Sequence, residues 1–188
     1  MHTLSLILLA VVALSGASIV IYTLGNGISP SPTTGKVKRR LLKSIADLPC
    51  SGHIYELGSG WGTLAIPIAK QFGECHVHGY ENSIVPYTVS RVRRLLGPPN
   101  LNLHWRNFMK SDLGTADVVV CYQSPGNMSR LRPKFEEELK NNAYVISNTF
   151  AVPGWKPTET HRVDDLFNTC IYVYRVGDAK SFRPTFVN

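Results

Sequence analysis

Three glycines and one acidic residue of this 188-residue sequence have the types and spacing needed to bind a nucleoside. Gly58, Gly60 and Gly62 follow a short apolar run. A ligand can lie against such a turn because glycine has no Cβ to collide with it. Glu81 comes roughly twenty residues later, after a second apolar run, where a carboxylate suits the two hydroxyls of a ribose.

The spacing separates two classes of cofactor. A dinucleotide-binding turn has the pattern Gly-x-Gly-x-x-Gly and holds a pyrophosphate, but Thr63 occupies the place of its last glycine. Glu56, just before the turn, would repel a pyrophosphate and suits a cationic or amine-bearing ligand. With Glu81 behind it, this pattern resembles motif I and the acidic loop of class I methyltransferases, which use S-adenosylmethionine. The alternative is an ordinary strand-to-helix loop.

Strands and helices are expected to alternate after the glycine turn, as in a parallel sheet with crossover helices. Helices are expected at residues 64–72, 83–96 and about 128–139, and parallel strands at 53–57, 75–80, 101–105, 118–122 and 144–147. Residues 162–166 and 170–176 are expected to form two final strands. The prediction is an α/β fold with a mostly parallel sheet that ends in an antiparallel hairpin.

The first 25 residues predict a membrane anchor. Residues 4–24 carry no charge and are rich in Leu, Ile, Val and Ala, which is roughly the length of a transmembrane helix. A cleaved signal peptide is the alternative, although no basic region precedes the apolar run. The expected organisation is a transmembrane anchor at 1–25, a linker at 26–35 and a catalytic domain at 36–180.

A basic cluster follows the linker and predicts the orientation of the domain. Its members are Lys36, Lys38, Arg39, Arg40 and Lys43. Such a cluster marks the cytoplasmic or mitochondrial matrix side of a membrane and can contact anionic lipids. The same segment is expected to be helical, with Val37, Leu41 and Ile45 on one face. A solvated charged face of this helix is the alternative to lipid contact. The expected localisation is a single-pass membrane protein with its catalytic domain on that side.

Composition narrows the expected partners. The net charge of +7 suggests an anionic neighbour, either nucleic acid or a membrane surface. The three arginines at 91, 93 and 94 lack interleaved aromatic residues, so no nucleic acid is expected. The four cysteines form no Cys-x-x-Cys pair, and nothing completes a metal site around His76 and His78. No metal and no disulfide framework are therefore expected.

Two later strand ends supply further candidate residues. Asn107 and Phe108 follow the third strand, and their amide and ring suit the edge and face of adenine, although Phe108 could also be a core residue. The fourth strand leads into Tyr122-Gln123-Ser124-Pro125, on the expected substrate side of the site. This sequence does not match the Asn/Asp-Pro-Pro-aromatic motif, which counts against methylation of exocyclic amines on bases.

Several segments together resemble one family. These are residues 30–33 (Pro-Ser-Pro-Thr), the glycine turn, Gly79-Tyr80-Glu81 and residues 152–155 (Val-Pro-Gly-Trp). They resemble the membrane-anchored class I lysine methyltransferases, which include mitochondrial enzymes acting on adenine nucleotide translocase and on the ATP synthase c-subunit. The resemblance covers residues 4 to about 176. Trp61 departs from it, because the family usually has a small acidic residue there.

The resemblance implies a class I methyltransferase (Rossmann-like) fold, S-adenosylmethionine as cofactor and a protein substrate with a target lysine. It implies a cofactor site formed by Glu56, Gly58, Ser59, Gly60, Gly62, Glu81, Asn82, Asn107 and Phe108. Tyr122 and Pro125 are expected to border the substrate channel, with Phe150 and Trp155 nearby. The alternatives are a membrane-bound lipid or small-molecule methyltransferase and a non-catalytic scaffold with a degenerate methyltransferase fold.

Overall fold

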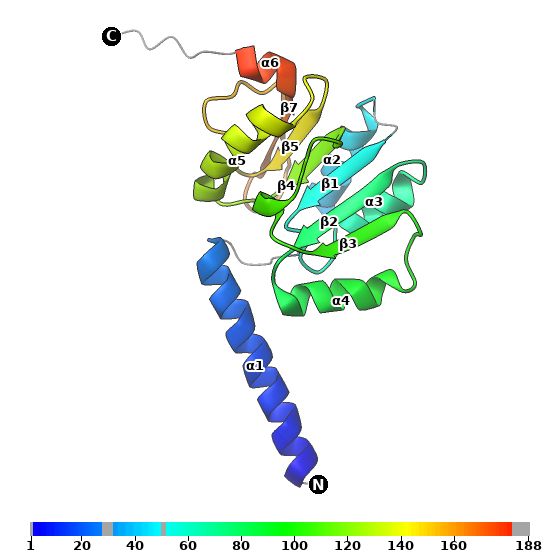
Figure 1. Cartoon of the computed structure of the whole chain (residues 1–188), viewed down its shortest axis with the longest axis vertical. Helices are drawn as coiled ribbons and strands as arrows, with labels where there is room; N and C mark the ends of the chain where they lie inside the picture. The colour runs from blue at the N-terminus through cyan, green and yellow to red at the C-terminus, as the bar shows by residue number, and fades with distance from the viewer. Residues whose placement is uncertain (1, 28–31, 50–51, 182–188) are drawn as a thin grey trace, which may run out of the picture.

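A seven-stranded sheet forms the centre of the protein in the computed structural model, which describes residues 2–27, 32–49 and 52–181 (Figure 1). The strands are β1 His53–Leu57, β2 His76–Glu81, β3 Leu101–Trp105, β4 Val118–Cys121, β5 Tyr144–Asn148, β6 Glu159–Arg162 and β7 Cys170–Arg175. Their order is β3-β2-β1-β4-β5-β7-β6. Strands β1 to β5 pair in parallel, whereas β7 runs antiparallel to both β5 and β6. The expected mostly parallel sheet with a terminal antiparallel hairpin is confirmed.

Helices cover the two faces of this sheet (Figure 1). One hydrophobic cluster lies between one face of the sheet and the buried residues of helices α2 Gly35–Ala46 and α3 Ala65–Gln71. Helix α4 Ile84–Arg94 packs against the same cluster through Tyr87. Helices α5 Pro125–Glu138 and α6 Val176–Ser181 belong to the cluster on the opposite face. Strand β4 is buried on both sides, as its uninterrupted apolar run predicts.

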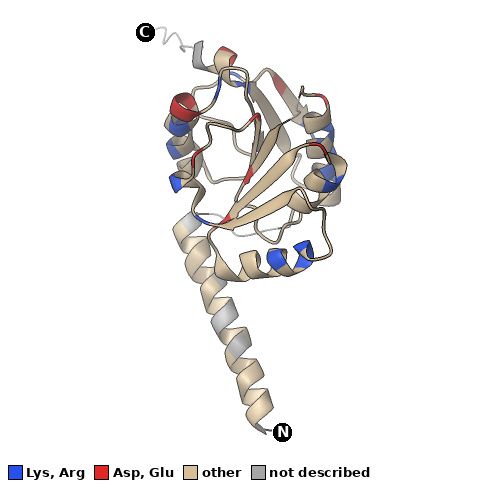
Figure 2. Ribbon diagram, turned by 45° about the vertical axis from the view of Figure 1, so that its right-hand side comes forward, with Lys and Arg blue, Asp and Glu red and all other residues tan. Residues whose placement is uncertain are grey.

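Most of the Lys and Arg residues in the described part of the chain lie on the helices, as Figure 2 shows. Helix α2 carries the basic cluster of residues 36–43 and buries Val37, Leu41 and Ile45. These three residues recur at the spacing of one helix face, so the charged residues between them turn away from the core. The helix predicted over this segment is confirmed.

The terminal hairpin starts earlier than expected. The sequence placed its first strand at 162–166, whereas β6 spans Glu159–Arg162 and residues 163–169 form the connection to β7. Strand β6 pairs only with β7 and lies at the edge of the sheet. An edge strand can be polar on both faces, so an apolar pattern does not reveal it.

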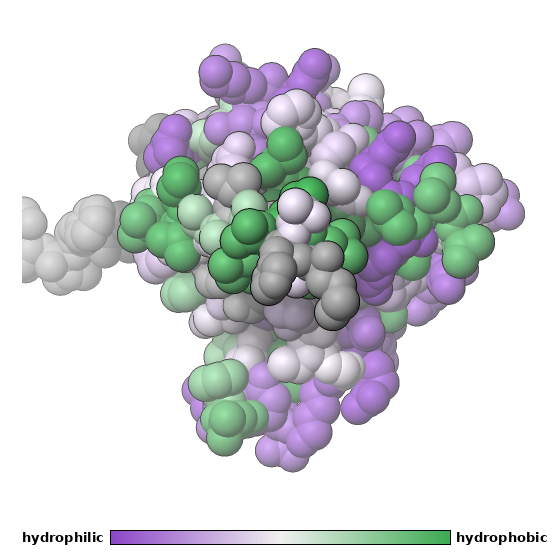
Figure 3. Space-filling model, turned by 90° about the horizontal axis from the view of Figure 1, so that it is seen from below, coloured by the Kyte–Doolittle hydropathy of each residue, from purple (hydrophilic) through white to green (hydrophobic). Residues whose placement is uncertain are grey.

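The N-terminal helix α1 spans His2–Asn26 and projects away from the sheet (Figure 1). Figure 3 looks along this helix from its N-terminal side and shows hydrophobic residues in the middle of the view. The expected membrane span is nevertheless wrong: among the residues that the structure describes, no helix has both the length and the apolar character needed to cross a bilayer. The predicted localisation, a single-pass membrane protein with its catalytic domain on the cytoplasmic or matrix side, is therefore also wrong.

Candidate functional site

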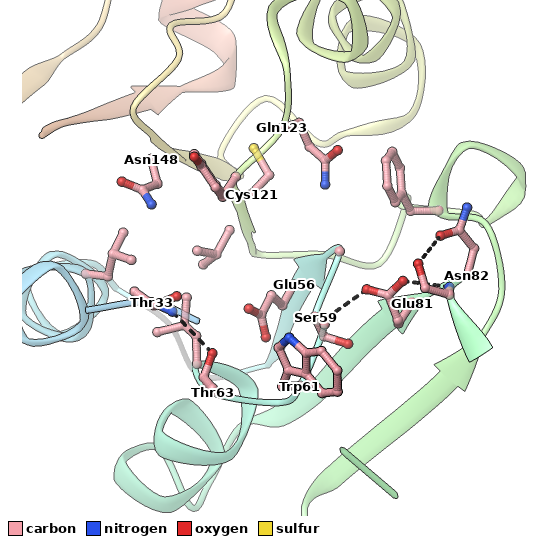
Figure 4. A pocket seen from close by; sticks show the side chains of 18 residues that line it. Thr33, Glu56, Ser59, Trp61, Thr63, Glu81, Asn82, Cys121, Gln123 and Asn148 are labelled. Carbon is pink, nitrogen blue, oxygen red and sulfur yellow. Dashed lines mark hydrogen bonds between the residues drawn. The ribbon is translucent and has the colours of Figure 1, made fainter. Parts of the chain in front are cut away.

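A cavity lies where the strand order reverses, between β1 and β4 (Figure 4). Connections leave these two neighbouring strands in opposite directions, and such a point is where α/β sheets bind ligands. The cavity has about 810 Å³ of empty volume, including space open to solvent. Eight of the predicted site residues line it: Glu56, Gly58, Ser59, Gly60, Glu81, Asn82, Phe108 and Tyr122.

The glycine turn forms one wall of the cavity and depends on its glycines. Gly58, Gly60 and Gly62 have φ values of 84°, 51° and 71°, in the left-handed region that other residues rarely adopt. A Cβ at Gly58 would also lie 2.5 Å from Nε2 of Gln123. The backbone N–H groups of Gly58 and Ser59 both donate to the carbonyl of Tyr80, at 2.9 Å. These bonds fix the turn beside the end of β2.

Glu81 is buried at the end of β2 and is held in place by backbone donors. Its Oε2 accepts the N–H of Gly60 at 2.8 Å, and its Oε1 accepts the N–H of Ser83 at 2.7 Å. A carboxylate offers about four acceptor sites, so each oxygen keeps capacity for a further donor. The side chain therefore both holds the glycine turn in place and lines the cavity.

Glu56 is the more unusual of the two acids. Its side chain is buried at the end of β1, and Oε2 has no hydrogen-bond partner among the described residues. Burial, followed by repulsion from Glu81, raises the pKa of Glu56 well above its usual value. The hydroxyl of Ser59, in the same cavity, also lacks a partner within the described part of the chain. Since unpaired buried polar atoms are costly, these two atoms mark a place where a ligand donor fits.

Not every predicted site residue lies at the cavity. Gly62 does not line the cavity, and a Cβ added to it would lie 3.2 Å from the Cβ of Ser90. Asn107 is exposed and caps the short helix η1 Phe108–Lys110. Pro125 is an exposed residue in the first turn of α5. Neither Asn107 nor Pro125 lines this cavity, and Trp155 packs in the core beside α5.

Gln123, Asn148 and Thr33 are among the cavity residues that were not predicted as site residues. Gln123 is buried, and its Nε2 donates to the carbonyl of Leu57 at 2.9 Å, which ties the end of β4 to the end of β1. Asn148 ends β5, and Thr33 comes from the segment before α2 (Figure 4). The backbone N–H of Thr33 lies 3.4 Å from Oγ1 of Thr63, at the glycine turn. A polar residue directly after an apolar strand was the only signal for Asn148.

A second cavity adjoins the first. It has about 1160 Å³ of empty volume, including space open to solvent, and shares Thr33, Tyr122 and Asn148 with the first cavity. Residues of the connection between β6 and β7 line its far side. The ring of Tyr122 stacks on Phe150, with ring centroids 6.1 Å apart and planes 15° apart. An aromatic pair therefore stands beside the junction of the two cavities.

Comparisons with known proteins agree on one family. The family model described as the ANTKMT methyltransferase domain matches residues 56–159. The chain is 31% identical to a protein-lysine N-methyltransferase of Saccharolobus islandicus (strain REY15A) over 152 residues, which cover 79% of this chain and 94% of that protein. It is 28% identical to a lysine N-methyltransferase of the ATP synthase c-subunit from Xenopus laevis over 157 residues, or 81% of this chain. The match spans only 64% of the length of the Xenopus laevis protein.

A solved structure supports the same fold. It is that of an RNA methyltransferase from Salinibacter ruber in complex with S-adenosyl-L-homocysteine. The TM-score is 0.69 at 26% sequence identity, and the similarity covers 78% of this chain and 94% of that one. The residues that line the first cavity can therefore be compared with the groups of S-adenosyl-L-homocysteine that a protein has to bind.

Proposed function

Because the chain belongs to the ANTKMT methyltransferase domain family, we propose that it transfers the methyl group of S-adenosylmethionine to the side-chain amine of a lysine in a protein. The fold is that of a class I methyltransferase, with the Rossmann-like strand order given above. The observation that carries the proposal is the buried pair Glu56 and Glu81 at the reversal of strand order. The lysine-specific relatives support the choice of acceptor.

The residues of the first cavity fit S-adenosylmethionine. The unpaired Oε2 of Glu56 suits the ammonium group of its amino-acid part, and the turn at Gly58 and Gly60 lets that part lie against the backbone. The carboxylate of Glu81 suits the ribose hydroxyls, with Asn82 beside it. The ring of Phe108 suits the face of adenine. Asn107 is exposed, so the proposal gives it only the role of holding η1.

The protein has to supply alignment and a dry environment rather than bond-making groups. Bound S-adenosylmethionine would supply a methyl group activated by its sulfonium, for in-line transfer to a neutral amine as the carbon–sulfur bond breaks and S-adenosylhomocysteine leaves. Tyr122 lines both cavities, so it borders the path from acceptor to cofactor. A lysine with its usual pKa near 10.4 is almost wholly charged at neutral pH, and a desolvated site lowers that pKa. We therefore assign Tyr122 and the adjoining Phe150 to the exclusion of water.

The extent of the transferase domain forms part of the proposal. The expected boundary at residue 36 is supported by α2, which buries Val37, Leu41 and Ile45 in the core. Thr33 and Leu41 also line the first cavity. A domain that includes Thr33 therefore suits the site better than one that begins at residue 36.

A fractionation experiment tests this proposal. The purified chain is incubated with S-adenosylmethionine labelled on its methyl group and with a lysate of its own organism from which the gene has been deleted. Protein, RNA, lipid and small molecules are then separated and counted. The proposal predicts label in protein, lost in the Glu56→Gln variant. Label confined to RNA, lipid or small molecules would contradict the lysine acceptor, and a chain that binds S-adenosylhomocysteine but labels nothing would contradict catalysis.

A further inference from the structure

The second cavity has features that the cofactor does not use. It is lined by the end of β5, the start of α2 and the connection between β6 and β7. We propose that this cavity receives the target lysine of the protein substrate, with Asp165 attracting its ammonium group and Phe167 contacting apolar residues beside it. This inference rests on the proposed function and names the acceptor side of that site.

The position of Asp165 gives the cavity a charged outer part and a neutral inner part. Asp165 lines only the second cavity, whereas the junction with the first is formed by Thr33, Tyr122 and Asn148. An ammonium group would meet the carboxylate first and then pass uncharged polar and aromatic side chains. Since desolvation favours the neutral amine, the lysine releases its proton to solvent through the open second cavity as it nears the cofactor.

The carboxylate of Asp165 is fixed by its own loop. The N–H of Thr169 donates to Oδ1 at 2.8 Å, and the hydroxyl of Thr169 donates to Oδ2 at 2.7 Å. These bonds lower the pKa of Asp165, so it stays ionised and is a weak base. Asp164, the next residue back along the chain, forms an ion pair with Lys36, but within the described residues Asp165 forms none. Asp165 therefore binds a cation rather than removing a proton.

Backbone strain is concentrated at the same cavity. Thr149 and Asn168 have φ values of 69° and 48°, and they are the two non-glycine residues with positive φ in the described ranges. Both line the second cavity. A β-branched residue such as threonine is costly in this conformation, and such strain is retained mainly at functional sites. The N–H of Thr149 donates to the carbonyl of Cys170 at 2.7 Å, which joins the residue after β5 to the first residue of β7.

The same loop presents an apolar tip. Phe167 lines the cavity although 78% of its surface is exposed, and the adjacent Leu166 is 89% exposed. Exposed large apolar side chains beside a ligand cavity commonly contact a partner. A lysine with apolar neighbours in the chain would place its ammonium near Asp165 and those neighbours on Phe167. The geometry thus favours substrates whose target lysine has apolar neighbours.

Peptide binding tests the inference separately from catalysis. The probe is a fluorescent peptide with one lysine between pairs of leucines, and its control has norleucine in place of the lysine. Binding is followed by anisotropy in the presence of S-adenosylhomocysteine. Asp165→Asn should weaken binding of the lysine peptide about two- to fivefold, as for an exposed ion pair, and the loss should shrink at high salt. Asp164→Asn removes the same charge one position away and should bind like the wild type.

Melting temperature, affinity for S-adenosylhomocysteine and methyl transfer are the controls for these binding measurements. Both variants should retain the wild-type melting temperature and affinity for S-adenosylhomocysteine. The inference is overturned if Asp165→Asn binds as well as the wild type, if Asp164→Asn loses as much, or if the norleucine peptide binds as tightly. In that case methyl transfer to the lysine peptide by the wild type would leave the proposed function standing. No methyl transfer to any peptide or protein would instead remove the proposed function, and this inference with it.

Phe167→Ser provides a second variant. It should weaken binding of the leucine-flanked peptide and leave a serine-flanked lysine peptide unchanged. Leu96→Ala is its control, because Leu96 is 95% exposed and lines neither of the two cavities. An equal loss for both peptides would overturn the apolar part of the inference.

Discussion

Replacing Glu56 by glutamine should stabilise the protein and weaken cofactor binding at the same time. Glu56 is buried, its Oε2 lacks a partner among the described residues, and Glu81 repels its charge. An unsatisfied buried polar group costs about 1–3 kcal/mol, and more when charged. Glutamine keeps the shape and removes the charge with its repulsion from Glu81, so at a pH where Glu56 is ionised the free energy of unfolding should rise by about 2 kcal/mol, the added cost of a buried unpaired group that is also charged. For a chain of this length, that corresponds to an increase of about 4–8 °C in melting temperature.

The same substitution replaces the charged carboxylate that would accept from the ammonium group of the cofactor with a neutral amide. A hydrogen bond to a charged group is worth about 1.5–3 kcal/mol, so the affinity for S-adenosylhomocysteine should fall about 10- to 150-fold. Calorimetric titration measures this affinity, and thermal unfolding without ligand measures the stability. Glu74→Gln is the matched control, since Glu74 is exposed and lies outside both cavities.

The stability effect should also depend on pH. The raised pKa of Glu56 means that the folded wild type binds a proton more readily than the unfolded chain does. Its contribution to stability is therefore present at low pH and is lost as pH rises above about 4.3, the usual value for Glu. The gain from Glu56→Gln should be larger at pH 8 than at pH 5. A variant that is less stable than the wild type at pH 8, or that binds the ligand equally well, would refute this reasoning.

Three further predictions concern separate parts of the molecule. Glu81→Ala removes the acceptor for the N–H of Gly60 and the proposed ribose contact, so calorimetry should show at least about tenfold weaker binding of S-adenosylhomocysteine. Unchanged affinity in a folded variant would exclude the ribose assignment. Tyr122→Ala should lower the turnover number more than cofactor affinity, because Tyr122 lines the junction of the cavities, and equal losses in steady-state kinetics and calorimetry would contradict this. Burial, and then repulsion from His104 and two other histidines, lowers the pKa of His78 to about 4, so the free energy of unfolding should fall as pH drops from about 6.5 towards 4. Urea unfolding should show a smaller fall for His78→Gln, and identical pH dependence for variant and wild type would disprove the effect.

The sequence predicts the sheet well because its strands are marked by local pattern. The run at 118–121 is apolar throughout and becomes β4, and the run at 101–105 becomes β3 with the expected bounds. The edge strand Glu159–Arg162 is polar and was placed too late, since pairing with β7 defines it and no periodicity does. The membrane span was inferred from the length of an uncharged apolar run and from the basic cluster beyond it, and it is not found among the described helices.

The residues of the candidate site likewise fall into two groups, those that the sequence reveals and those that it does not. Glu56, the glycine turn and Glu81 are recognisable because their chemistry and spacing lie within one stretch of sequence. Asn148 was not predicted, because its place after an apolar strand is a weak signal and it reaches the cavity through the pairing of β4 with β5. Thr33 reaches it through packing of the segment before α2. Asn107 was predicted from its place after a strand, but its side chain caps η1 instead.

The most direct test of the central claim is tandem mass spectrometry of acceptor protein methylated with deuterated S-adenosylmethionine. The deuterium identifies methyl groups added in the reaction. The account predicts one, two or three labelled methyl groups on lysine Nζ with the wild type, and a strongly reduced yield with Glu56→Gln. Labelled methyl groups on any other atom, or an undiminished yield with Glu56→Gln, would contradict it.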